Sequence, residues 1–184
     1  MAKLVSKTYG EALFEAASES GAQKPGELME EIRVIMSILE ENPQFDQLME
    51  HPGIAKQEKL QVVSDVFRGR VSEELANFLE IVVSKERYRD LPEIFDYYIR
   101  KVKEQKKIGV AYVTTAVELS EDRKAAVLNR LLETSGYREM EIHYAVDPAV
   151  IGGMIIRIND RVVDSTVRTK LDKLTKQLLQ IQLG

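Results

Sequence analysis

The chain has 184 residues, no cysteine, two histidines and a formal net charge of −4. This length fits one large domain or two small ones. The absence of cysteine excludes disulfides, catalytic thiols and thiolate metal sites. No run reaches the roughly 18 uninterrupted apolar residues of a membrane-spanning helix, and the first residues lack the apolar core of a signal peptide. An acidic chain without a dense basic patch also disfavours nucleic-acid binding. We therefore expect a soluble protein that binds no nucleic acid and does not insert into a membrane.

Charge is distributed unevenly along the chain. Residues 1–105 carry 14 basic and 20 acidic side chains, whereas residues 106–184 carry 12 basic and 10 acidic ones. The first part is therefore negative and the second weakly positive. Opposite signs favour two separate contact surfaces. Charge that only solvates the surface gives the same count, and both interpretations stay open.

Residues 1–105 read as amphipathic stretches of helical period, which predict six helices. The stretches are separated by helix-breaking or helix-starting residues, namely Gly21, Pro25, Asn42 with Pro43, Pro52 with Gly53, Gly69, Ser72 and Pro92. Such short connections fold neighbouring helices back on each other. The sequence therefore predicts an all-α bundle of six helices for residues 1–105.

The fifth predicted helix is apolar on most of its circumference. Its apolar residues are Leu75, Phe78, Leu79, Ile81, Val82 and Val83. A helix of this kind is normally buried on all sides, which favours a central position in the bundle. Alternatively, part of its surface joins the first helix in an open groove for a partner helix.

A charged run at residues 101–107 predicts a domain boundary, because the pattern changes after it. Residues 108–117 are rich in β-branched side chains and predict a strand. Ser120 is expected to cap a helix that ends near Ser135 and Gly136, and alternation over residues 141–146 predicts a second strand. Residues 106–184 are therefore expected to form a small α+β domain.

Residues 146–174 predict one packed unit of a turn, a hairpin and a helix. Asp147 and Pro148 open the turn, Gly152 and Gly153 add backbone freedom, and residues 154–158 predict a strand. The turn at Asn159 and Asp160 leads to the partner strand at Val162 and Val163, and Asp164 or Ser165 is expected to cap the helix. The apolar residues of this helix repeat in heptads, at Val167, Leu171, Leu174, Leu178 and Ile181.

No catalytic, cofactor or metal site is predicted. His143 has no Cys or His nearby, and the sequence does not show the oriented partner that base chemistry needs. His51, before a Pro-Gly pair, is most simply a loop residue. Gly152 and Gly153 match neither a phosphate loop nor a dinucleotide fingerprint. Paired acids on predicted helices, such as Glu30 and Glu31, are typical of solvated surfaces.

Three motifs resemble, in order, the delta subunit of F-type ATP synthases, a family that includes the mitochondrial oligomycin-sensitivity-conferring protein. Residues 9–17, YGEALFEAA, resemble the opening helix of the family. Residues 77–79 with 89–94 resemble its fifth and sixth helices, and residues 146–174 resemble its C-terminal signature. The resemblance therefore covers nearly the whole chain.

This resemblance implies a non-catalytic stator subunit without a cofactor, present in one copy per complex at the cytoplasmic face of a bacterial cell membrane. It implies that residues 1–105 bind the alpha subunits of the catalytic head and residues 106–184 bind the b-subunit stalk. The implied groove for an alpha-subunit helix comprises Val5, Tyr9, Leu13, Ala16, Phe78, Leu79 and Val82. The candidates for stalk binding are Lys176, Leu178, Ile181 and Leu183. The alternatives are a free-standing cytosolic helical adaptor and an enzyme with an unrecognised site.

Overall fold

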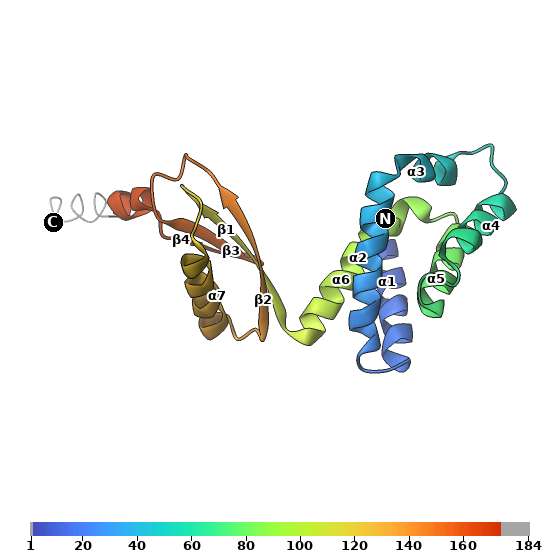
Figure 1. Ribbon diagram of the computed structural model, residues 1–184, viewed down its shortest axis with the longest axis horizontal. Helices are drawn as coiled ribbons and strands as arrows, with labels where there is room; N and C mark the ends of the chain where they lie inside the picture. Colours follow the sequence, from blue (N-terminus) through green and yellow to red (C-terminus); the bar gives the residue numbers. More distant parts are fainter. Residues whose placement is uncertain (1, 174–184) are drawn as a thin grey trace. The chain divides into compact units, whose positions relative to one another are not determined.

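The computed structural model describes residues 2–173 and divides into two compact units, which meet between Val102 and Lys103. The first unit is helical and the second combines helices with a four-stranded sheet (Figure 1). The predicted order of a helical part followed by an α+β part is confirmed. The boundary expected after residue 105 falls three residues from the division in the structure, within the charged end of the last helix of the first unit.

The N-terminal unit is built from short-linked helices. They are α1 (Ala2–Glu19), α2 (Lys24–Glu41), α3 (Pro43–Glu50), α4 (Lys56–Phe67), α5 (Glu73–Ser84), the 3-10 helix η1 (Tyr88–Asp90) and α6 (Leu91–Lys106). Pro25 lies in the first turn of α2, where its missing N–H costs nothing. Asn42 ends this helix, and its side-chain amide donates to the carbonyl of Ile38 over 2.7 Å.

The 3-10 helix η1 was not predicted from the sequence. It follows Glu86, which has a positive φ of 57° and turns the chain out of α5. The hydroxyl of Tyr88 donates a hydrogen bond to the Asp46 carboxylate of α3, which fixes the turn against the bundle. Burial, together with this hydrogen bond, raises the pKa of Tyr88.

The core of the helical unit is centred on α5 and α6. All large apolar side chains of α5 are buried except Ile81, which is 50% exposed. Phe95 and Tyr98 of α6 are almost wholly buried, and the Tyr98 hydroxyl donates to the carbonyl of Pro25 over 3.1 Å. This bond satisfies a polar atom that burial would otherwise leave without a partner.

The C-terminal unit has a sheet with the strand order β2-β1-β3-β4. Its elements are β1 (Ile108–Thr115), α7 (Glu121–Ser135), β2 (Glu139–Val146), β3 (Met154–Ile158) and β4 (Arg161–Asp164). β1 and β2 are parallel and joined by α7, whereas the β1–β3 and β3–β4 pairs are antiparallel. Gly136 ends α7 in the left-handed conformation, with φ 72°, close to the predicted end.

Close packing around Gly153 explains its place before the hairpin. Its φ is 85°, and a Cβ at this position would lie 2.5 Å from the carbonyl oxygen of Ser165. Only glycine combines this backbone conformation with such a close approach. The start of the helix after β4 is thereby held against the start of β3.

The expected cap of this helix was wrong by one or two residues. The capping side chain is Thr166, whose hydroxyl accepts a hydrogen bond from the amide of Thr169 over 3.2 Å. Asp164 still pairs with Ile155 in the sheet, so it lies outside the helix. Its carboxylate instead accepts from the Thr166 amide and the Thr169 hydroxyl, and these bonds lower the pKa of Asp164. Residues 167–173 are helical.

Candidate protein-binding surfaces

The first candidate surface lies along α1 and α5, which pack side by side. The rings of Tyr9 and Phe78 meet edge to face, with centroids 6.4 Å apart and an angle of 72°. The structure therefore brings the two halves of the predicted groove together. Four of its seven residues belong to the core, because Leu13, Phe78, Leu79 and Val82 are all at most 7% exposed.

The outer part of this surface is made by the residues that retain exposure. Val5 and Tyr9 are half-buried and Ala16 is exposed. Ile81, at 50% exposure, is a large apolar residue of α5 that the sequence analysis left out of the groove.

The sequence contains a signal for the exposed side of α5. Asn77, Ile81 and Ser84 are spaced by four and three residues, so they share one side of the helix. Two polar residues on the same stripe as Ile81 indicate that this stripe faces solvent. We refer to Val5, Tyr9, Ala16 and Ile81 as the α1–α5 surface.

The α1–α5 surface is supported from behind by α6. The Tyr97 hydroxyl donates to the Glu11 carboxylate over 2.9 Å. A Cβ at Gly10 would lie 2.5 Å from the Tyr97 ring, so glycine lets the two helices approach closely.

An ion pair links α5 to α2, since Lys24 of α2 lies 3.7 Å from Glu74 of α5. The pKa of Glu74 is lowered, chiefly by a hydrogen bond from its own backbone amide at the start of α5.

The second candidate surface lies at the end of the sheet where the last helix begins. Val167 and Leu171 of this helix are 44% and 58% exposed, and Ile151 in the preceding loop is 77% exposed. Val167 is within van der Waals reach of the loop, since a Cβ at Gly152 would lie 3.3 Å from it. The predicted stalk-binding residues Lys176, Leu178, Ile181 and Leu183 lie outside the described residues.

The ionisable groups of the sheet form surface pairs. His143 stacks on Tyr112 with centroids 5.0 Å apart, and its Nε2 lies 3.3 Å from Glu141 Oε1. Glu141 also pairs with Lys103 Nζ at 2.7 Å. Within residues 2–173 no three His, Cys, Asp or Glu side chains are grouped to hold a metal ion, and no helix is long and apolar enough to cross a membrane.

Comparison with known proteins places the whole chain in one context. The family described as ATP synthase delta (OSCP) subunit matches residues 5–178. ATP synthase subunit delta of Lachnoclostridium phytofermentans is 49% identical over the full length of both chains. The subunit of the same name from Alkaliphilus oremlandii is 36% identical over 98% of this chain and 99% of its own. A chain of the mitochondrial ATP synthase hexamer of Toxoplasma gondii shares the fold, with a TM-score of 0.70 over 95% of this chain and 97% of its own at 20% identity.

Proposed function

This chain belongs to the ATP synthase delta (OSCP) subunit family, and on that basis we propose how it serves as a non-catalytic stator subunit of an F-type ATP synthase. The helical unit binds the alpha subunits of the catalytic head, and the α+β unit binds the b subunit of the peripheral stalk. One copy per complex acts at the cytoplasmic face of the bacterial cell membrane. A stator has to resist the torque of the rotor, so it needs two contacts that hold at the same time.

The observation that carries this proposal is the presence of two compact units, each with its own exposed apolar surface. Apolar patches rimmed by polar residues mark protein-binding sites on otherwise polar surfaces. The six α-helices of the first unit act as one bundle that presents the α1–α5 surface. The second unit presents Ile151, Val167 and Leu171.

On the helical unit, the N-terminal helix of an alpha subunit lies along α1 and α5. Val5, Tyr9 and Ala16 of α1, together with Ile81 of α5, contact this helix. The remaining groove residues, Leu13, Phe78, Leu79 and Val82, form the floor that holds the contact residues in place. Tyr9 serves as the anchor, because an aromatic side chain in the centre of a helix-binding groove contributes most of the binding free energy.

On the α+β unit, the apolar stripe of the last helix takes part in stalk binding. Val167 and Leu171 begin this stripe, and Leu178, Ile181 and Leu183 continue it in the sequence beside Lys176. Residues 165–184 contain four basic side chains and one acidic side chain. Apolar contacts therefore supply the affinity, and the basic residues attract acidic residues of the stalk during encounter.

The test is whether the chain bridges head and stalk. The purified head of the parent synthase and the soluble part of its b subunit are sedimented together with and without this protein. We expect all three components to sediment as one complex, and head and stalk fragment to sediment separately without the protein. A protein that binds neither component would instead be a free-standing adaptor.

A further inference from the structure

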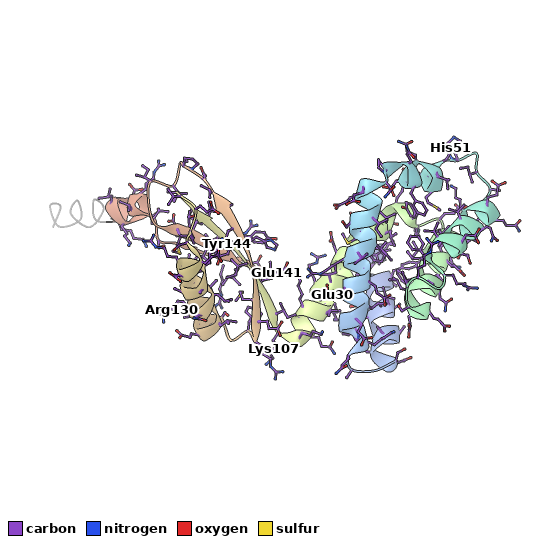
Figure 2. All side chains as sticks on the ribbon, viewed as in Figure 1. Glu30, His51, Lys107, Arg130, Glu141 and Tyr144 are labelled. Carbon is purple, nitrogen blue, oxygen red and sulfur yellow. The ribbon has the colours of Figure 1, made fainter. Side chains whose placement is uncertain are left out.

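The sheet of the C-terminal unit is only half covered by α7. Ala111 and Val113 of β1 are fully buried, and Tyr144 of β2 reaches α7, donating from its hydroxyl to the carbonyl of Lys124 over 3.3 Å. Figure 2 labels Tyr144 on this strand and Arg130 on α7. The β1–β2 half of this face is therefore covered by a helix.

The β3–β4 half of the same face is apolar and open in the described part of the chain. The register places Ile158 opposite Ala111, Ile156 opposite Val113, and Val163 opposite Ile156, so these side chains share the α7 side. Val163 is 60% exposed. In a two-layer α+β fold, helices cover the apolar face of the sheet, and one helix position beside α7 is free here.

A groove with a volume of about 660 Å³ marks this free position. Its walls are Leu131 of α7 and the apolar residues Ile156, Ile158 and Val163 of the hairpin. Ser135 of α7 also lines the groove.

The rim of the groove is more basic than acidic. Its lining residues include two basic side chains, Arg130 and Arg161, and one acidic side chain, Asp160. Arg130 pairs with Glu133 at 3.4 Å, but both side chains are largely exposed, so this pair is easily exchanged for another. An occupant with acidic residues on its flanks complements this rim.

We propose that this groove binds an acidic amphipathic helix, and, since this rests on the proposed function, that the helix belongs to the b subunit of the stalk. The chain's own residues 174–184 fit less well, because they contain one lysine and no acid to meet Arg130 and Arg161. The groove adds to the stalk-binding surface formed by the last helix. Stalk binding then involves the groove beside α7 as well as the C-terminal helix.

Thiol protection tests this site directly, because the natural chain has no cysteine. A cysteine is introduced as Val163→Cys in the groove, and as Ala145→Cys in the control. Ala145 is exposed and pairs with Thr114, which alternates with Val113 and so faces the other side of the sheet. The probe is the soluble part of the b subunit of the parent synthase, and the readout is the rate of alkylation by a maleimide.

With the stalk fragment bound, we expect alkylation of the Val163→Cys protein to slow by about tenfold or more, and alkylation of the Ala145→Cys protein to stay unchanged. A complex that forms while Val163→Cys reacts at its free rate overturns the groove but leaves the stator function standing. Absence of any complex with the unmodified protein overturns both. Protection of Val163→Cys before the stalk is added assigns the groove to another occupant and overturns the proposal. If deletion of residues 174–184 removes this protection, the occupant is the chain's own terminus. If the protection depends on protein concentration, the occupant is a second copy of the chain.

The charges of the rim provide a second measurement. We expect the double substitution Arg130→Glu and Arg161→Glu to weaken binding of the stalk fragment by about tenfold at low salt, with less effect at high salt. The double substitution Arg123→Glu and Arg138→Glu is the matched control, because both residues are exposed and neither lines the groove. Equal weakening by the control and by the substitutions in the rim indicates a general charge effect and contradicts the role of the rim.

Discussion

Alanine in place of Ile81 tests where the core of the helical unit ends and its binding surface begins. Ile81 is 50% exposed, whereas Leu79, two residues earlier on α5, is 3% exposed. Full burial of an isoleucine contributes about 1.5–3 kcal/mol. If an alpha-subunit helix binds here as proposed, we expect the exposed half of Ile81 to contribute about 1 kcal/mol to binding and Ile81→Ala to weaken this binding about fivefold.

The same comparison predicts effects of different size on the free energy of unfolding. Leu79→Ala removes a fully buried side chain and lowers the free energy of unfolding by about 2–5 kcal/mol. In a unit of this size, such a loss lowers Tm on the order of 10 °C or more. Ile81→Ala costs about 1 kcal/mol or less, because half of its side chain already faces solvent. Leu79→Ala is therefore expected to affect mainly stability, and Ile81→Ala mainly binding of the partner helix.

The assay is calorimetric titration with a peptide of the N-terminal helix of the alpha subunit, with thermal unfolding of each variant followed by circular dichroism. Ile38→Ala on α2 is the matched control, because Ile38 has nearly the same exposure, 49%. We expect Ile38→Ala to bind the peptide as the unmodified protein does. A larger loss of affinity with Ile38→Ala than with Ile81→Ala would refute the assignment and place the partner helix on α2.

Three further predictions concern the separate units and their ends. Residues 1–105 alone should give an almost wholly helical circular dichroism spectrum and one cooperative melt; substantial strand content would contradict the division. Deletion of residues 176–184 should preserve binding of the alpha-subunit peptide but weaken retention of the b subunit in a pull-down; normal retention would remove this segment from the stalk contact. Asp164→Ala should lower Tm at neutral pH. Because hydrogen bonds hold the pKa of Asp164 below its ordinary 3.8, the stabilisation is present above that pH and is lost as the pH falls through the lower pKa of the folded state. The Tm difference should therefore shrink as the pH falls below 3.8, and a difference that keeps its full size there would point to another cause.

Sequence patterns were sufficient where local chemistry determines the structure. Pro25 and Asn42 define the ends of α2, and Gly136 ends α7 near its predicted position. The apolar run at residues 154–158 and the turn at Asn159 and Asp160 also predicted the β3–β4 hairpin. The register of the sheet and the parallel pairing of β1 with β2 depend on contacts between residues far apart in the chain, so the sequence pattern alone did not supply them.

Sequence patterns were insufficient where the same local pattern fits more than one structure. Asp164, Ser165 and Thr166 are all good capping residues, and only the pairing of Asp164 with Ile155 leaves Thr166 as the cap. On α5, apolar residues on nearly all sides predict burial but do not show which one stays exposed. The polar neighbours Asn77 and Ser84 carried that information for Ile81.

The stator function is tested most directly by ATP-driven proton pumping in membranes stripped of this subunit. Addition of the full chain should restore both attachment of the head and pumping, because torque is transmitted only while head and stalk are joined. ATP hydrolysis by the head should continue without the chain, since the chain contributes no catalytic group. Full pumping in membranes that lack the chain, or no recovery after its addition while the head is bound, would contradict the account.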